Sequence, residues 1–456
     1  MSAATPVVAA TAAPAPVSFW DAFRFWLKLG FISFGGPAGQ IAIMHTELVE
    51  RRRWISERRF LHALNYCMVL PGPEATQLAT YIGWLMHRTW GGIVAGGLFV
   101  LPSLFILIAL SWIYMAFGEQ PLVAGLFYGI KPAVTAIVVH AAHRIGSRAL
   151  KNAWLWTIAA AAFVAIFALD APFPLIVLGA AAIGVVGGRI APERFRVGGA
   201  HASKQAPHER ALIDDDTPPP PHARFSPRRL ALVIAVSLLL WALPLAGVAA
   251  LQGGQGTLPQ MGWFFTKAAL LTFGGAYAVL PYIYQGAVAH QGWLSGTQMI
   301  DGLALGETTP GPLIMVVAFV GFVGGWQSAD LAALLGTDQR FLAGAIAAAL
   351  VTWFTFLPSF VFILAGGPLV EATHDDLKFT APLSAITAAV VGVIVNLALF
   401  FGWHVLWPRG AQGPFEWPSA LIALAAAIAL FRFKRGVIEV ITGCALAGLA
   451  WHWTMT

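Results

Sequence analysis

Long apolar stretches, separated by short polar segments, run along almost the entire chain. A helix needs roughly 20 apolar residues to cross the hydrocarbon core of a bilayer. Uninterrupted stretches of about this length, or slightly less, lie at 91–117, 122–145, 152–169, 173–189, 229–251, 341–365, 380–405, 417–432 and 436–453. A transmembrane β-barrel would instead require short segments of alternating polarity. The pattern therefore predicts an all-α, polytopic integral membrane protein.

Four further apolar segments are interrupted near their middle by glycine and proline. The interruptions are Gly35-Gly36-Pro37 within 19–44, Pro71-Gly72-Pro73 within 60–86, Gly274-Gly275 within 260–287 and Pro310-Gly311-Pro312 within 297–326. Both residue types break helices. Inside a membrane, backbone that is not helical is tolerated only where protein buries it or where it lines a wet cavity. We expect broken or re-entrant helices around a transport site, with a packing kink as the alternative at each break.

The broken segments occur twice in the same order. Four landmarks return 239 residues further along: Phe34 as Phe273, Trp54 as Trp293, Pro71 as Pro310 and Lys28 as Lys267. This agreement predicts a duplicated unit. The expected organisation is a disordered tail (1–18), a first transport repeat (19–191), a disordered cytoplasmic linker (192–228), a linking transmembrane helix (229–251) and a second, inverted transport repeat (252–456).

The placement of arginine predicts opposite orientations for the two repeats. The loop 45–62 contains five arginines, whereas its counterpart 284–301 contains no lysine or arginine. Positive loops stay in the cytoplasm, so the first loop is expected inside and the second outside. The N-terminus and the linker are then cytoplasmic and the C-terminus is periplasmic. We expect nine full spans plus four re-entrant limbs, or up to 13 spans in total.

Composition supports a membrane protein and excludes several other classes. Hydrophobic residues make up 58% of the chain and charged residues only 11%, far below the roughly 25% of a soluble domain. The two cysteines, Cys67 and Cys444, lie in apolar runs and indicate neither a disulfide framework nor a zinc site. The linker is rich in aspartate and proline, which is typical of disorder. The tail lacks the basic region of a signal peptide.

The breaks favour an anionic substrate. A helix that restarts at Pro37, Pro73, Ala276 or Pro312 presents free amide hydrogens in its first turn and the positive end of its dipole. Four such ends, each about half a charge, match a dianion in order of magnitude. The candidate substrate-binding residues at the breaks are Phe34, Gly35, Gly36, Pro37, Gln40, Pro71, Gly72, Pro73, Thr76, Gln77, Phe273, Gly274, Gly275, Thr309, Pro310, Gly311 and Pro312.

Charged residues inside apolar segments are the other candidates. Lys28, Lys131 and Lys267 are expected to supply positive potential along the pathway, with snorkelling to the membrane surface as the alternative for Lys28 and Lys267. Glu74 and Glu307, each beside a Pro-Gly-Pro break, are candidate proton carriers, because burial shifts a carboxylate towards its protonated form. The alternative for Glu74 is a partner of the helix dipole.

Other chemistry has little support in the sequence. Neutral side chains at the breaks, among them Asn65 and Thr308, could equally hold helices together. His140 and His143 are spaced for a metal but have no carboxylate or thiol nearby, so we expect no metal site. There is no nucleotide-binding glycine motif and no nucleophile elbow. We expect no enzyme activity, no cofactor and no nucleic-acid partner.

The motifs together resemble the chromate ion transporter family in its long, two-repeat form. The matching text in the first repeat is Lys28-Leu29-Gly30-Phe31-Ile32-Ser33-Phe34-Gly35-Gly36-Pro37, Arg53-Trp54-Ile55, Leu70-Pro71-Gly72-Pro73, Leu101-Pro102-Ser103 and Lys131-Pro132. In the second repeat it is Lys267, Thr272-Phe273-Gly274-Gly275, Trp293-Leu294 and Thr309-Pro310-Gly311-Pro312. The second repeat departs from the first at Ala276, where the first has Pro37, and at Ala381, where the first has Lys131.

The resemblance implies chromate efflux across the bacterial inner membrane, driven by the proton motive force and conferring chromate resistance. It also implies inverted halves, and sulfate as an analogue of the substrate. We therefore expect a secondary active transporter for a tetrahedral divalent oxyanion, in which one half rocks against the other. A sulfate or other anion transporter, an anion channel and, less favoured, a membrane enzyme are the alternatives, and a homodimer is left open.

Overall fold

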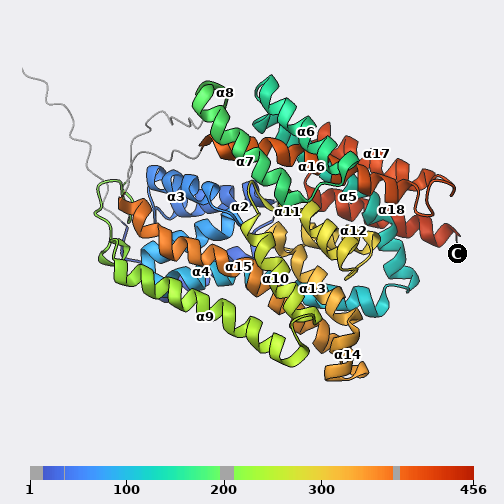
Figure 1. Ribbon diagram of the computed structural model, residues 1–456, viewed down its shortest axis with the longest axis horizontal. Coiled ribbons are helices and arrows are strands. Elements are labelled where there is room, and N and C mark those ends of the chain that lie inside the picture. The colour runs from blue at the N-terminus through green and yellow to red at the C-terminus, as the bar shows by residue number, and fades with distance from the viewer. Residues whose placement is uncertain (1–13, 35, 196–209, 373–379, 456) are drawn as a thin grey trace, which may run out of the picture.

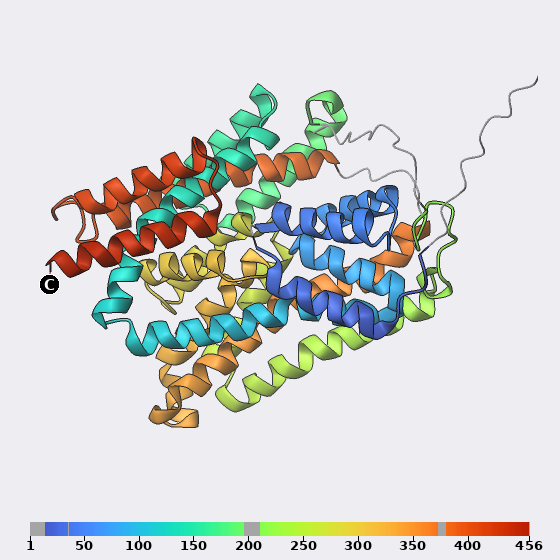
Figure 2. The ribbon, with the colours of Figure 1, turned by 180° about the vertical axis from the view of Figure 1, so that it is seen from behind.

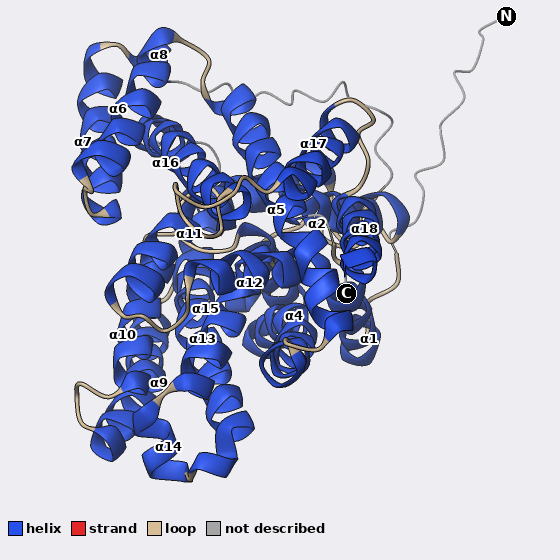
Figure 3. Ribbon diagram, turned by 90° about the vertical axis from the view of Figure 1, so that its right-hand side faces the viewer, coloured by secondary structure: helices blue, strands red, loops and turns tan. Residues whose placement is uncertain are grey.

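The computed structural model describes residues 14–34, 36–195, 210–372 and 380–455. Regular structure in these ranges is helical, with one isolated β-bridge between Ile55 and Ile213 (Figure 3). The first repeat contains α1 (Phe19–Ile32), α2 (Gly36–His45), the π-helical turn η1 (Thr46–Arg51), α3 (Glu57–Val69), α4 (Glu74–Phe117), α5 (Pro121–Ala149), α6 (Ala153–Leu169), α7 (Phe173–Ile190) and α8 (Pro192–Phe195). The connecting segment contains the short helix η2 (Pro221–Ala223) and α9 (Pro227–Gln252).

The second repeat presents the same elements in the same order. It contains α10 (Thr257–Leu270), α11 (Ala276–Ile283), the π-helical turn η3 (Tyr284–His290), α12 (Gly296–Thr308), η4 (Leu313–Met315), α13 (Val316–Gln327), α14 (Ala329–Leu335), η5 (Thr337–Gln339), α15 (Arg340–Ala372), α16 (Thr380–Leu406), α17 (Trp417–Phe431) and α18 (Val437–Met455). Helices α3 and α12 begin and end 239 residues apart, each with a serine N-cap (Ser56 and Ser295). A π-helical turn precedes both caps. The duplication read from the sequence is confirmed element by element.

All four predicted breaks end helices. Helix α1 stops before Gly36 and α3 stops before Pro71; in the second repeat α10 stops before Gly275 and α12 before Pro310. The half-helices of the first repeat approach the centre from one side of the molecule, and those of the second repeat approach from the opposite side (Figures 1 and 2). The two repeats are therefore inverted relative to each other.

Helix α4 is a hairpin. Its backbone leaves the helical region at His87 and Arg88, so the limb that starts at Glu74 turns back along the limb that ends at Phe117. The two limbs touch backbone to backbone, since a Cβ atom on Gly91 would collide with the carbonyl oxygen of Gly83. The second repeat packs α13 on α15 in the same way, but joins them through α14 and η5.

The number of spans lies at the lower end of the expected range. Seven described helices are long and apolar enough to cross a membrane, namely α4, α5, α7, α9, α15, α16 and α18. The shorter apolar helices α6 and α17 raise the number to nine. The broken helices α1–α3 and α10–α13 account for the re-entrant limbs.

The two repeats interlock, so that each of two helical bundles contains parts of both. In the first, which we name the span bundle, α5 packs on α16, α17 and α18, and α16 also packs on α6 and α7. In the second, the break bundle, α1, α13 and α15 pack around α4, and α9 and α10 pack on α15. Helices α11 and α12 lie between the two bundles and contact both: α11 packs mainly on α16, and α12 packs on α5 and α13 (Figure 3). A motion of one repeat against the other would separate helices that pack together in both bundles, and the expected rocking stays a prediction.

The connecting segment also differs from the prediction. Residues 210–226, expected to be disordered, are held against the first repeat; we name them the strap. The amides of Leu212 and Ile213 donate to the carbonyls of Arg53 and Trp54 at 2.9 and 3.0 Å. The Ile213 side chain is only 7% exposed. Composition predicted disorder because an average over a polar segment does not reveal the single apolar residues that anchor it. Residues 196–209 lie outside the described part of the chain.

Candidate functional site

The breaks of the two repeats meet in reciprocal pairs. The amide of Gly311 donates to the carbonyl of Ser33 at 2.8 Å, and the amide of Gly72 donates to the carbonyl of Thr272 at 2.7 Å. Each Pro-Gly-Pro break of one repeat therefore lies against the glycine break of the other. The two contacts are related by the repeat itself, since Ser33 corresponds to Thr272 and Gly72 to Gly311. The four interruptions thus form one centre inside the protein.

Two serines close this centre from the opposite repeat. A Cβ atom on Gly311 would lie 2.9 Å from the Cβ atom of Ser103, and one on Gly72 would collide with the hydroxyl of Ser359. Both glycines have positive φ angles, 99° and 123°, which other residues rarely adopt. Ser103 and Ser359 end the two Leu-Pro-Ser motifs. Only glycine fits at these points in each repeat.

Buried polar side chains surround the first-repeat breaks. Gln40 is 1% exposed, and its Nε2 donates to the carbonyl of Gly311 at 2.5 Å. Gln77 is fully buried, and its Nε2 donates to the carbonyl of Pro71 at 2.8 Å. Within the described residues, several buried polar atoms have no hydrogen-bond partner: the hydroxyls of Ser33, Thr76 and Ser103 and the amide oxygens of Gln40 and Gln77. Unpaired buried hydroxyls are costly and are available to a ligand.

A small cavity of about 20 Å³ connects the centre with the span bundle. Its wall contains Gly36 at the start of α2, Tyr277 in the first turn of α11, Glu307 near the end of α12, and Arg144 on α5. The Tyr277 hydroxyl donates a short hydrogen bond to Glu307. Two helix N-termini and the guanidinium of Arg144 therefore border the same space and favour an anion, whereas the carboxylate of Glu307 opposes one when it is charged. The volume holds about one water molecule, so a tetrahedral oxyanion requires the bundles to separate.

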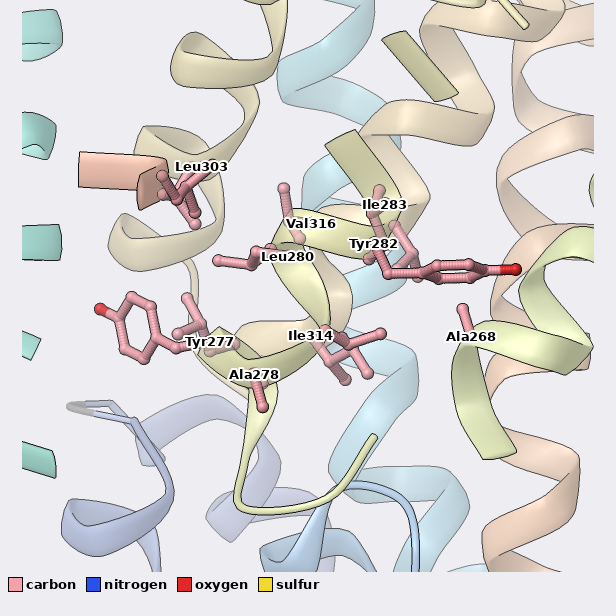
Figure 4. Packing of buried hydrophobic residues seen from close by; sticks show 14 of the residues in the cluster. Ala268, Tyr277, Ala278, Leu280, Tyr282, Ile283, Leu303, Ile314 and Val316 are labelled. Carbon is pink, nitrogen blue, oxygen red and sulfur yellow. The ribbon is translucent and has the colours of Figure 1, made fainter. Parts of the chain in front are cut away.

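Packing around this cavity is dense on the side of the second repeat. Figure 4 shows Leu280 of α11 between Leu303 of α12 and Ile314 of η4, with Tyr277 and Ala278 of α11 below it. All of these residues are buried. The first turn of α11 is thus packed among apolar side chains beside the cavity that Tyr277 lines.

A second charged group lies further along α5. Lys131 Nζ is 3.5 Å from Asp301 Oδ2 of α12, and the hydroxyl of Tyr114 on α4 donates to the same oxygen at 2.9 Å. The predicted pathway lysine therefore reaches the interface between the span bundle and the break bundle. Lys28 and Lys267 do not reach it: both are exposed on the outer surface, and Lys267 lies over the ring of Trp263 at 5.9 Å. Their part in substrate binding stays a prediction.

The remaining predicted residues divide between the centre and its rim. Thr309 is buried but donates to the carbonyl of Leu305 in its own helix. Glu74 is half-buried in the first turn of α4. Residues of intermediate exposure at the breaks are Phe34, Gly36, Pro37, Pro71, Phe273 and Gly274, whereas Pro73, Gly275, Pro310 and Pro312 are buried. Asn65 is exposed, and Gly35 lies outside the described residues.

Three charged or hydroxyl side chains of the site were not among the candidates. Arg144 was read as a loop charge that sets topology, and Asp301 as the end of a loop. A signal for Asp301 existed, because it lies within the apolar, broken segment 297–326, where an acidic residue is costly. Tyr277 had no such signal. In the part of the chain that the structure describes, no group of three or more His, Cys, Asp or Glu side chains is arranged to hold a metal ion.

Inverted repeats with interrupted helices that meet at the centre of the molecule define the class: this is a polytopic membrane transporter of the inverted-repeat type. The family model described as "Chromate transporter" matches residues 20–185 and 259–449, one match in each repeat. The chain belongs to the chromate transporter family.

Relatives of full length agree with this assignment. A chromate transport protein of Pseudomonas aeruginosa is 33% identical over 96% of this chain and 93% of its own length. A probable chromate transport protein of Synechococcus elongatus is 27% identical over 93% of this chain and 94% of its own length. A chromate transport protein of Cupriavidus metallidurans is 28% identical over 93% of this chain and 91% of its own length. No solved structure matches the chain.

Proposed function

We propose that this protein is a secondary active transporter that exports chromate, a tetrahedral dianion, across the inner membrane of a bacterium and thereby confers chromate resistance. The observation that carries the proposal is the cavity where two helix N-termini from different repeats face Arg144. This wall offers positive potential from both repeats at once. Buried hydroxyls at the neighbouring breaks supply further hydrogen bonds. The chromate transport proteins among its relatives support the choice of anion.

We infer the direction of transport from two things: the membrane topology that the placement of charged residues predicts, and the membrane potential. The arginines of loop 45–62 and Arg144, Arg148 and Lys151 after α5 assign this side to the cytoplasm, with the C-terminus in the periplasm. Moving one charge through 100 mV is worth about 2.3 kcal/mol, so a dianion leaving a negative interior gains about twice that amount. The electrical part of the proton motive force thus favours export.

Transport requires the span bundle to move relative to the break bundle. The cavity is closed around a volume of about 20 Å³, which is too small for chromate. Its wall combines residues of both bundles, so their separation enlarges it. Alternating access would open the cavity first to the cytoplasm and then to the periplasm.

Glu307 and Glu74 remain the proposed proton carriers. Glu307 is 8% exposed and lies in the cavity wall with Arg144, where a change in its protonation would alter the potential at the substrate. Glu74 lies at the N-terminus of α4. If E74Q and E307Q together leave proton-driven uptake by vesicles unchanged, neither carboxylate couples the proton.

The proposal is tested by uptake of labelled chromate into inverted membrane vesicles, in which export appears as accumulation. We expect accumulation that depends on the membrane potential, that competing sulfate reduces, and that R144Q abolishes. The matched control is R148Q, one turn further along α5 on the exposed surface. Chromate flux that is not coupled to the proton gradient would indicate a channel. Uptake of sulfate without uptake of chromate would indicate a sulfate transporter. Equal loss in R144Q and R148Q would contradict the proposed site.

A further inference from the structure

The ion pair between Lys131 and Asp301 ties the two bundles together. Lys131 belongs to α5 of the span bundle and Asp301 to α12 between the bundles, while Tyr114, which donates to the same carboxylate, belongs to α4 of the break bundle. The carboxylate is 1% exposed, whereas the lysine side chain is 30% exposed. Charge that is buried so completely requires a partner, so the pair holds the bundles at their present distance.

The carboxylate of Asp301 is only partly satisfied. Lys131 and Tyr114 both approach Oδ2, whereas the buried Oδ1 has no hydrogen-bond partner among the described residues. A buried carboxylate oxygen without a donor carries a desolvation cost that no contact offsets. The ion pair is therefore weaker than one in which both oxygens of the carboxylate accept hydrogen bonds. An anion that binds Lys131 more strongly can replace Asp301.

The pair also breaks the symmetry of the duplication. Asp301 corresponds to His62 of the first repeat, and Lys131 corresponds to Ala381 of the second. His62 instead lies 3.4 Å from the carbonyl of Val370. The pair Lys131–Asp301 therefore has no symmetry-related counterpart, because Ala381 and His62 stand at the corresponding positions. A directional transporter needs such a difference between its two sides, whereas the packing of the repeats does not.

We propose that Asp301 is an exchangeable counter-ion: the transported dianion takes its place on Lys131, and this exchange releases the break bundle from the span bundle. The inference rests on the proposed function and names a second anion-binding position, beyond the cavity at Arg144. At equal distance a dianion attracts the ammonium group twice as strongly as a single carboxylate. Substrate binding and bundle release then become one event.

The exchange also involves a proton. Once Lys131 is engaged by the dianion, Asp301 remains buried as an unpaired carboxylate, and taking up a proton from water removes this charge. The charged or titratable groups that face Asp301 are Lys131 from α5 and Tyr114 from α4. Among the described residues of the other elements packed on α12, namely α13, α16, α18, η3 and η4, none forms an ion pair or hydrogen bond with this carboxylate. By linkage, anion binding strengthens proton binding and acid strengthens anion binding to the same extent.

The test measures sulfate binding to the full-length protein in detergent by titration calorimetry at pH 6 and pH 8, in buffers of different ionisation enthalpy. For the wild type we expect net proton uptake on binding and tighter binding at pH 6. For D301N we expect about tenfold tighter binding at pH 8, no proton uptake at this site and a flatter pH profile, since the competing charge is gone. K131M should lose this binding, and the double variant K131M/D301N provides the measurement if K131M alone does not fold.

The matched control is E416Q. Glu416 also accepts a hydrogen bond from a tyrosine of α5, Tyr128 at 3.1 Å, but no lysine in the described part of the chain pairs with it. E416Q should leave affinity and proton uptake as in the wild type. If D301N binds sulfate with unchanged or weaker affinity and undiminished proton uptake, Asp301 is a structural residue and the inference is wrong, while the proposed function stands. If the wild type binds neither sulfate nor chromate, both fail.

Discussion

Gly311 illustrates how single residues determine the centre of this transporter. Its amide donates to Ser33 of the other repeat, its carbonyl accepts from Gln40, and its φ angle of 99° excludes most other residues. Ser103 occupies the space where a side chain would begin. Four constraints therefore act on one position, and its counterpart Gly72 shares three of them: the amide bond to the other repeat, the positive φ angle and a serine where a side chain would begin.

Substitution of Gly311 by alanine should destabilise the protein by about 2–4 kcal/mol, because a strained backbone angle and a collision with Ser103 add together. Thermal unfolding in detergent measures the effect. The control is G97A on α4, where a Cβ atom would meet no atom within 4 Å. We expect G97A to be neutral or slightly stabilising, since alanine favours helix. Similar stability of G311A and the wild type would show that the breaks do not meet as described.

At the residue scale the sequence located the helix breaks, where the chemistry is local, and the part of these residues in substrate binding stays a prediction. Gly72, Gly311 and Gln40 were identified because helix breakers and polar residues stand out in an apolar run. Arg144 and Asp301 were missed because their roles depend on which helices become neighbours. That information is not local: Lys131 and Asp301 are far apart in the chain and meet only after the repeats interlock.

At the scale of elements, the hydrophobic pattern predicted the helices closely. The expected spans 122–145 and 380–405 correspond to α5 (Pro121–Ala149) and α16 (Thr380–Leu406). The break positions were also confirmed, because proline and glycine act on the backbone of their own turn. The turn at His87 and Arg88 in α4 falls between the expected segments 60–86 and 91–117, although it contains neither proline nor glycine.

The strap is the element for which composition wrongly predicted disorder. Its fold depends on a few contacts, among them His222, whose Nε2 lies 2.8 Å from the carbonyl of Trp84. Burial, with Arg88 and Arg229 nearby, lowers the pKa of His222 from its ordinary value of 6.5. The docked strap therefore prefers neutral histidine, and its stability is present above about pH 6.5 and decreases as pH falls.

Acidification should accordingly loosen the strap. We expect faster limited proteolysis within residues 210–226 at pH 5.5 than at pH 7.5, because the released histidine binds a proton that the docked one resists. The variant H222N should remove most of this pH dependence. Cleavage that is equally slow at both pH values in the wild type would mean that His222 does not control docking.

At the scale of the whole molecule, duplication produced two bundles that each combine both repeats. The span bundle contacts the break bundle through α11 and α12, and both the cavity and the pair Lys131–Asp301 lie along this contact. The sequence predicted the inversion from arginine placement, but it could not predict the interlocking, because the order of packing between distant helices leaves no local pattern.

Cross-linking distinguishes motion between the bundles from motion within them. Gln285 of η3 donates to the carbonyl of Ala171 beside α7 at 3.4 Å, so A171C/Q285C joins the two bundles away from the cavity. Y128C/E416C joins α5 to α17 inside the span bundle. Both pairs are placed in a background without Cys67 and Cys444. A short thiol cross-linker should stop chromate uptake by A171C/Q285C and leave uptake by Y128C/E416C largely intact. The reverse result would contradict motion between bundles.

The most direct measurement is the position of a bound tetrahedral dianion. Selenate has this shape and charge, and its selenium can be located by anomalous diffraction from crystals of the full-length protein. The account predicts a selenium peak within the molecule, between the starts of α2 and α11 and the guanidinium of Arg144, in an enlarged cavity. A selenium peak found instead on the outer surface beside Lys28 or Lys267, with the interior empty, would contradict it.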